Sequence, residues 1–221
     1  MFTESVIERL IDGLWITVQL VVMAGAVGTA AAILSGLAGL SPSRAVRWAN
    51  QVYVDFFRGS SAIIQLYWAF YALPIIDRDL LTFSPMQVGV VVLGLNMGGY
   101  GSEIVRGAVR AVPSGQFEAS TALSIAGYQR MRYIVFPQAM LAMLPPYGNL
   151  LIEMLKGTAL VSLITLSDIT RVGLDLRQAG DLSSASTFTT LLVIYFCLAV
   201  FITFLIRRAE RFARRSMGLE V

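Results

Sequence analysis

The chain has 221 residues but contains no histidine and a single cysteine, Cys197. One cysteine forms no disulfide within a chain, and without cysteine and histidine clusters we expect no metal site. The lack of histidine also excludes a Ser-His-Asp triad and any acid–base catalysis by imidazole. Glu, Asp, Lys and Tyr side chains remain capable of catalysis, so an enzyme stays an alternative, although we expect no catalytic residues here.

Charge is scarce as well, because charged residues make up 14% of the chain and hydrophobic residues 56%. The mean hydropathy is +0.70. A helix needs about 20 apolar residues to cross a hydrocarbon core of about 30 Å. Five charge-free stretches have about this length: 13–40, 59–76, 80–102, 133–152 and 182–206. The pattern predicts an all-α integral membrane protein in which residues 1–221 form a single transmembrane domain.

The basic residues are distributed unevenly between the segments that join these stretches. Arginines gather at positions 44, 47, 106, 110, 130, 132, 207, 208, 211, 214 and 215, whereas the alternate segments hold Asp77, Arg78, Asp79, Asp168, Asp175 and Asp181. Positive residues favour the cytoplasmic side, so the N-terminus is predicted outside and the C-terminus in the cytoplasm. The pI of about 9.2 therefore reflects topology. We expect contact of the basic tail with anionic membrane lipid, and no nucleic acid.

Small residues recur at every fourth position of the first apolar stretch, at Ala24, Gly28, Ala32 and Gly36. Such a row lets two helix backbones approach closely, which is how membrane helices pack without a hydrophobic driving force. The row predicts a packing surface with no direct role in transport.

The segment 107–132, between the third and fourth apolar stretches, has the pattern of a short helix. It follows a turn at Pro113, with Ser114 as the predicted N-cap and Glu118 in the first helical turn. Gly127 is the predicted end of the helix. One face carries small or apolar side chains, namely Ala119, Ala122, Leu123 and Ala126. An interfacial helix would carry large apolar anchors and a basic face, so this pattern favours docking to a soluble cytoplasmic partner.

Motifs along the whole chain resemble one known family. They are Asp55–Ser60 with Gln65; Tyr100, Glu103, Arg106 and Gly107; Pro113–Gln116; Glu118-Ala119-Ser120 with Gly127; Phe136-Pro137-Gln138-Ala139; Pro145, Pro146 and Asn149; Lys156-Gly157-Thr158 with Leu160; and Thr17, Tyr195 and Glu210. Together they resemble the binding-protein-dependent ABC importer permeases of the polar amino-acid uptake branch, with their EAA loop. The chain departs from that pattern at Ser120, where alanine is usual, and at Ser124, where the family generally has glycine.

The resemblance implies a permease subunit with the fold of type I ABC importers, placed in the bacterial inner membrane. It implies cytoplasmic ATP-binding subunits, a periplasmic or lipid-anchored solute-binding protein, and a second permease subunit, identical or a sister chain. Coupling to the ATPase is then expected at Glu118, Ala119, Ser120, Ala122, Leu123 and Gly127. The chain lacks a G-x-x-x-x-G-K-[ST] motif, so we expect no cofactor in it, and ATP and magnesium to be used by the partner ATPase.

Polar residues at the ends of the third and fourth stretches form the candidate solute path, namely Asn96, Tyr100, Glu103, Asn149, Glu153 and Lys156. Ionisable groups at membrane depth usually face the protein interior or a water-filled cavity. Glu153 and Lys156 are three residues apart, so they either pair with each other or meet the two ends of a zwitterion.

A polar zwitterionic solute, with amino acids first, is thus the predicted cargo. An ectoine-like or betaine-like compatible solute is the alternative cargo. Two interpretations from other classes stay open: a membrane scaffold that docks a cytoplasmic protein without transport, and an intramembrane enzyme that uses Glu103 or Glu153.

Overall fold

The computed structural model describes residues 4–77 and 81–216, which form helices and turns without any strand. Three of the described helices are long and apolar enough to cross a bilayer on their own. They are α1 (Glu4–Ala38), α5 (Pro85–Arg110) and α10 (Ser184–Ser216). The start of α5 is fixed by a capping box, in which Ser84 and Gln87 exchange side-chain and backbone hydrogen bonds.

Two further candidate spans are bent. Helix α2 (Arg44–Gly59) meets the segment Ala62–Ile76 at 102°. That segment consists of α3 (Ala62–Tyr67), the π-helix η1 (Trp68–Ala72) and α4 (Leu73–Ile76).

The second bent pair starts after the helix α6 (Ser114–Ala122). Its first arm consists of α7 (Gly127–Arg130), the π-helix η2 (Met131–Val135), α8 (Phe136–Gly157) and the 3₁₀ helix η3 (Thr158–Ile164). This arm meets α9 (Ile169–Gln178) at 50°. Counting each bent pair as one span gives up to five spans in the described residues, the number that the sequence predicts.

The helices differ from the predicted stretches mainly at their ends. Helices α1, α5, α8 and α10 continue past the charge-free stretches into charged residues, because charge at a helix end does not interrupt the backbone hydrogen bonds. The predicted second stretch, 59–76, begins at the 102° bend, so the charged helix α2 before it was missed as part of that element. Leu80, the predicted start of the third stretch, lies outside the described residues, as do Arg78 and Asp79.

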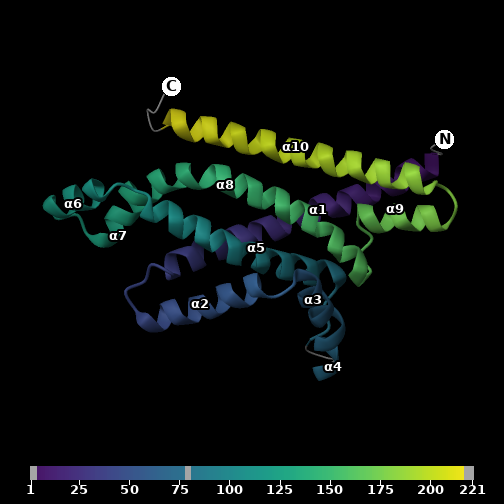
Figure 1. Ribbon diagram of the computed structural model, residues 1–221, viewed down its shortest axis with the longest axis horizontal. Helices are drawn as coiled ribbons and strands as arrows, with labels where there is room; N and C mark the ends of the chain where they lie inside the picture. The colour runs from purple at the N-terminus through teal and green to yellow at the C-terminus, as the bar shows by residue number, and fades with distance from the viewer. Residues whose placement is uncertain (1–3, 78–80, 217–221) are drawn as a thin grey trace.

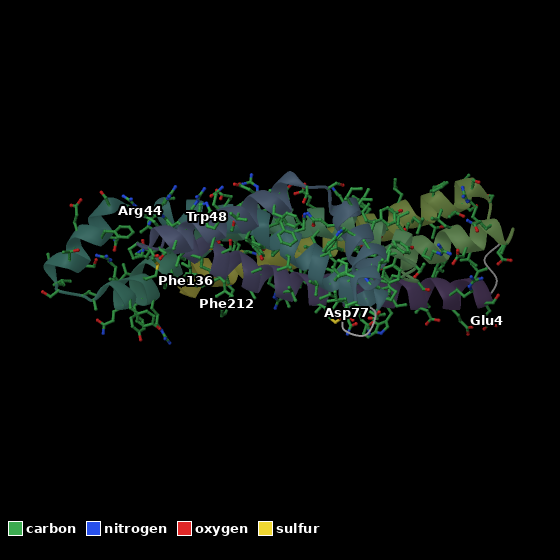
Figure 2. The ribbon with its side chains drawn as sticks, turned by 90° about the horizontal axis from the view of Figure 1, so that it is seen from below. Glu4, Arg44, Trp48, Asp77, Phe136 and Phe212 are labelled. Carbon is green, nitrogen blue, oxygen red and sulfur yellow. The ribbon has the colours of Figure 1, made fainter. Side chains whose placement is uncertain are left out.

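The two ends of the molecule carry different elements (Figure 1). The N-terminus and α9 lie at one end, whereas α6, α7 and the C-terminal end of α10 lie at the other. Figure 2 places Arg44 and Phe136 toward the end opposite Glu4. This arrangement agrees with the charge pattern, in which the basic segments share one side. That this side faces the cytoplasm stays a prediction.

The row of small residues in α1 packs against α5. Ala24, Gly28, Ala32 and Gly36 are all buried. A Cβ atom on Gly28 would lie 2.8 Å from Met97 Sδ, and one on Gly36 would lie 2.6 Å from Val105 Cβ. The predicted close packing surface is therefore confirmed, and its partner is α5.

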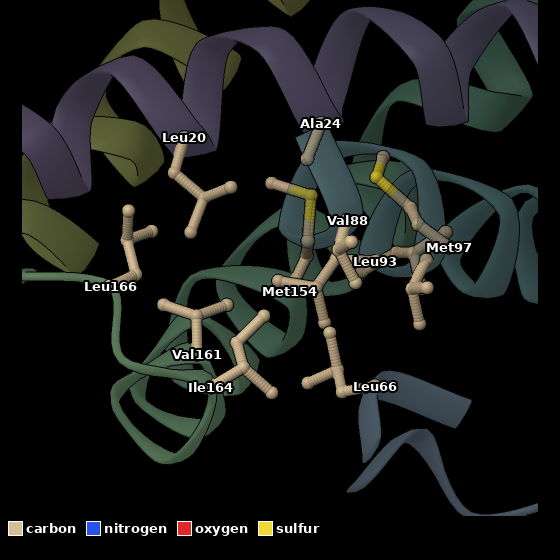
Figure 3. Packing of buried hydrophobic residues seen from close by; sticks show 12 residues of the cluster. Leu20, Ala24, Leu66, Val88, Leu93, Met97, Met154, Val161, Ile164 and Leu166 are labelled. Carbon is tan, nitrogen blue, oxygen red and sulfur yellow. The ribbon is translucent and has the colours of Figure 1, made fainter. Parts of the chain in front are cut away.

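The main hydrophobic core continues from this contact toward α8 and η3 (Figure 3). Leu20 and Ala24 of α1 meet Met97 of α5, Met154 of α8 and Val161 of η3 in one cluster. Leu66 of α3 closes the cluster from the side of the bent segment. The core thereby fixes α5 and α8 relative to each other, and these two helices carry all six residues of the candidate solute path.

Polar contacts join the N-terminal half of α1 to the start of α9. The Thr17 hydroxyl accepts a hydrogen bond from the Ile169 backbone N–H at 3.0 Å. The fully buried Asp168 caps α9 by accepting from the N–H groups of Thr170 and Arg171, both at 3.1 Å. These two hydrogen bonds satisfy N–H groups of the first turn of α9 that have no partner within the helix. Asp168 lies outside the five predicted stretches.

Candidate functional site

The helix predicted between the third and fourth apolar stretches is present as α6, with a different start. It begins at Ser114 after Pro113, whose extended conformation (φ −54°, ψ 136°) ends the preceding turn. No side chain caps this end, so the N-cap predicted at Ser114 is wrong. Because Ser114 is itself the first helical residue, Glu118 lies beyond the first turn, where it was predicted.

The end of α6 also differs from the prediction. The helix ends at Ala122, and Ser124 adopts a left-handed conformation with φ 55°. The Ile125 N–H then bonds to the Ser120 carbonyl at 2.9 Å, which reverses the chain. Gly127 therefore opens α7 instead of ending α6. Left-handed backbone favours glycine, which gives a physical reason for a glycine at the position of Ser124 in the family pattern.

Helix α6 presents one face outward and rests on the other. Glu118, Ala119, Ala122 and Leu123 are exposed, and Leu123 is 74% exposed. Ser120 is 2% exposed, and its hydroxyl donates to the Phe117 carbonyl at 2.8 Å. Phe117 packs against the cluster formed by α1, α5, η2 and α8. The exposed face carries the small side chains of Ala119 and Ala122, as predicted. Ser120 instead lies on the inner face, where its hydroxyl bonds within the helix.

Arg130 joins α6 to α7. Its guanidinium stacks over the Phe117 ring at 5.6 Å and donates to the Thr121 hydroxyl at 3.1 Å. A stacked guanidinium with a hydrogen bond fixes a helix more firmly than either contact alone. Arg130 therefore holds α6 at a set angle to the following helix. Sequence reasoning used Arg130 only as a marker of sidedness and did not predict this role.

A cavity of about 200 Å³ lies between α3, α5 and α8. It brings together three residues of the candidate solute path, Asn96, Tyr100 and Glu153. The Asn96 amide donates to the Phe57 carbonyl at 2.9 Å, and the Tyr100 hydroxyl donates to the Arg58 carbonyl at 3.4 Å. Both side chains therefore also tie the end of α2 to α5.

The other three residues of that path do not line this cavity. Glu103 forms an ion pair with Arg106 on the same helix. Asn149 and Lys156 are exposed on α8, on the same helical face as Glu153. The described residues contain no ion pair between Glu153 and Lys156, although their spacing allows one. These two charges are thus available to a group outside this chain.

Gln65 is a buried polar residue at the bend between α2 and α3. From the sequence it was named only as part of a motif. It is 8% exposed. Its amide N–H donates to the Ser60 hydroxyl at 2.7 Å, which itself donates to the Phe56 carbonyl at 2.5 Å. The Gln65 Oε1 atom has no partner. A polar side chain inside a long apolar stretch was the signal that could have identified it.

No group of three or more candidate metal ligands occurs in the described part of the chain.

Comparison with known proteins decides the family. A family model described as the binding-protein-dependent transport system inner membrane component matches residues 16–215. The chain belongs to this permease family. The resemblance read from its motifs is thereby confirmed, and the chain is an integral membrane component of a transport system.

Curated relatives in this permease family match over most of their length. The chain is 39% identical over 209 residues to a probable amino-acid ABC transporter permease, y4tF, from Sinorhizobium fredii, covering 93% of this chain and 87% of the relative. It is 31% identical over 205 residues to the glutamine transport system permease GlnP from Escherichia coli, covering 93% of each.

Solved permease structures share the fold. A crystal structure of an amino acid ABC transporter with histidines has a TM-score of 0.83 and 27% identity, covering 96% of this chain and 99% of that one. An inward-facing structure of the methionine transporter MetNI has a TM-score of 0.80 at 21% identity, with the same coverage. The second likeness concerns the fold alone.

Proposed function

We propose that this permease is one transmembrane subunit of an ATP-driven, binding-protein-dependent importer of a polar zwitterionic solute, with amino acids as the cargo. The main support is the family match together with relatives that are named as amino-acid permeases at 39% and 31% identity. The proposed location is the bacterial inner membrane. A periplasmic or lipid-anchored solute-binding protein would deliver cargo at the end that carries the N-terminus and α9.

Coupling to ATP hydrolysis is assigned to the exposed face of α6. Glu118, Ala119, Ala122 and Leu123 project from the end of the molecule on which the arginines gather. Small side chains allow this helix to sit deeply in a groove of a cytoplasmic ATP-binding subunit, which would use the ATP and magnesium. Ser120 and Gly127 contribute to the shape of the turn between α6 and α7 and not to the contact with the ATP-binding subunit.

The solute path is assigned to the cavity that holds Asn96, Tyr100 and Glu153. A carboxylate at Glu153 suits the ammonium group of an amino acid, and the hydroxyl and amide offer further hydrogen bonds. The exposed row formed by Asn149, Glu153 and Lys156 leaves this path open on one side. A second permease subunit, identical or a sister chain, would close it.

The test is the ATPase activity and uptake of the complete reconstituted complex, with a panel of amino acids and compatible solutes presented by its binding protein. We expect amino acids to stimulate both activities. Stimulation by compatible solutes alone would replace the proposed cargo, and a complex that associates with no ATPase would favour the scaffold interpretation.

The coupling assignment is tested in the same complex with Glu118→Lys. We expect this charge reversal to uncouple ATP hydrolysis from uptake while membrane insertion stays normal. Glu8→Lys makes the same charge change on an exposed residue near the opposite end, and we expect it to leave coupling intact. Normal uptake by Glu118→Lys would reject docking through α6.

The solute path is tested with Glu153→Gln, which removes the charge and keeps the size of the side chain. We expect a raised KM for uptake of an amino acid at an unchanged amount of protein in the membrane. Glu210→Gln is the matched control, because Glu210 pairs with Arg214 in the tail and is far along the chain from the cavity. Equal kinetics for wild type and Glu153→Gln would assign Glu153 a structural role.

A further inference from the structure

An apolar crevice of about 360 Å³ runs between α1, α8 and α10. Its walls are Val18, Val21, Val22, Gly25, Ala26 and Thr29 of α1, Leu151 and Leu155 of α8, and Leu198, Phe201, Ile202, Leu205 and Ile206 of α10. The wall on α1 extends over about 16 Å at 1.5 Å per residue. This length is about half of a hydrocarbon core of about 30 Å, which is the depth that one acyl chain occupies.

The polar atoms in this crevice are already satisfied. The Thr29 hydroxyl donates to the Gly25 carbonyl at 2.6 Å and accepts from the Tyr147 hydroxyl at 2.9 Å. A polar solute would find no free partner there, and an apolar cavity of this kind does not hold water. The crevice is therefore suited to a hydrocarbon chain and is separate from the cavity at Glu153.

Basic residues follow the crevice on α10. Arg208 is three residues beyond Leu205 and seven beyond Phe201, so it lies on the same helical face one turn further. Arg208 is exposed and forms no ion pair among the described residues, whereas Glu210 is paired with Arg214. Arg207 is two residues from Leu205 and lies on the opposite face. An unpaired guanidinium thus adjoins the end of the hydrocarbon-sized crevice.

We propose that this crevice is a binding site for one anionic phospholipid, with an acyl chain between α1 and α10 and the phosphate at Arg208. Guanidinium binds phosphate with two parallel hydrogen bonds, and its aliphatic stem can lie along the apolar wall. The predicted cytoplasmic position of the tail agrees with this assignment, because that surface is rich in anionic lipid.

The first test is lipid retention by the purified full chain, measured by native mass spectrometry with dioleoyl phosphatidylglycerol and dioleoyl phosphatidylcholine. We expect the wild type to bind the anionic lipid about fivefold more tightly, the effect of one arginine at a membrane surface. Arg208→Gln should remove this preference, and Arg207→Gln should keep it. Equal affinities for the two lipids in the wild type, or an equal loss in both variants, would overturn a specific phosphate site.

The acyl-chain half of the proposal is tested by filling the crevice with Ala26→Phe, while Leu34→Phe places the same ring at an exposed position of α1 outside it. Ala26→Phe should weaken binding of both lipids, and Leu34→Phe should not. Unchanged lipid binding by Ala26→Phe would overturn the proposal, as would tight binding of chain-free glycerophosphoglycerol. A shift of Ala26→Phe from dimer to monomer would instead assign the crevice to a second copy. Circular dichroism and melting confirm that each variant is folded.

Discussion

Helices α5 and α10 are both long and apolar, but they are stabilised in different ways. In the apolar window of α5, 61% of residues are buried within this chain, whereas in the window of α10 only 6% are buried. Glycines bring α5 against α1, whereas α10 packs through one side only, with Ile206 beside Gly148 of α8 and Leu191 beside Gly173 of α9. Hydropathy therefore identifies a helix that enters the membrane but does not show whether it faces protein or lipid.

The largest expected effect comes from truncating matched leucines in the two regions. Leu20 of α1 is fully buried in the main hydrophobic core, and Leu192 of α10 is 70% exposed. We expect Leu20→Ala to cost about 2–5 kcal/mol of unfolding free energy and Leu192→Ala less than about 0.5 kcal/mol. Thermal melting of both variants in one detergent measures the difference. Equal losses would show that α10 is as tightly packed as α1.

Two glycines on α5 sharpen the contrast within a single helix. A Cβ on Gly98 would lie 2.5 Å from Ala31 Cβ and 2.6 Å from the Tyr53 hydroxyl, whereas Gly107 has nothing within 4 Å. We expect Gly98→Ala to destabilise by about 1–3 kcal/mol through overpacking, and Gly107→Ala to stabilise by up to about 1 kcal/mol. Melting temperatures that move in the same direction would contradict the close contact of α1 and α5.

Helix α6 belongs with the weakly held elements, because few apolar contacts fix it. Arg130→Ala removes one stacking contact and one hydrogen bond, a loss of about 1 kcal/mol. We expect faster amide hydrogen exchange across α6, with a smaller effect elsewhere. Arg132→Ala is the control, since Arg132 stacks on Tyr133 and donates to the Tyr128 hydroxyl, and both partners lie outside α6. Equal exchange in the two variants would show that Arg130 does not hold the helix.

The features that the sequence predicted correctly are those that repeat along the chain. The row of small residues fixed the contact face of α1 before its partner was known, because spacing alone determines a helical face. The exposed face of α6 followed from Ala119 and Ala122 in the same way. Family membership followed from many ordered motifs, which no single residue could have provided.

The features that were missed depend on contacts between distant segments. Ser60 and Ser61 are extended at the bend of α2 and α3, yet two serines are a weak signal for a turn of 102°. The spacing of Glu153 and Lys156 allowed a pair, but the rotation of α8 is set elsewhere, by Tyr147 against Thr29 and Gly148 against Ile206. Sequence spacing describes one helix and does not describe its neighbours.

The glycine contacts between α1 and α5 also limit how this permease can move. Gly28, Gly36 and Gly98 each bring a backbone within reach of a side chain on the other helix, so sliding by one turn would force side chains through these contacts. Helices α1 and α5 should therefore move together as one rigid body. Changes of shape during a transport cycle would then concentrate at the two bends, beside Ser60 and Asp168, and along the loosely packed α10.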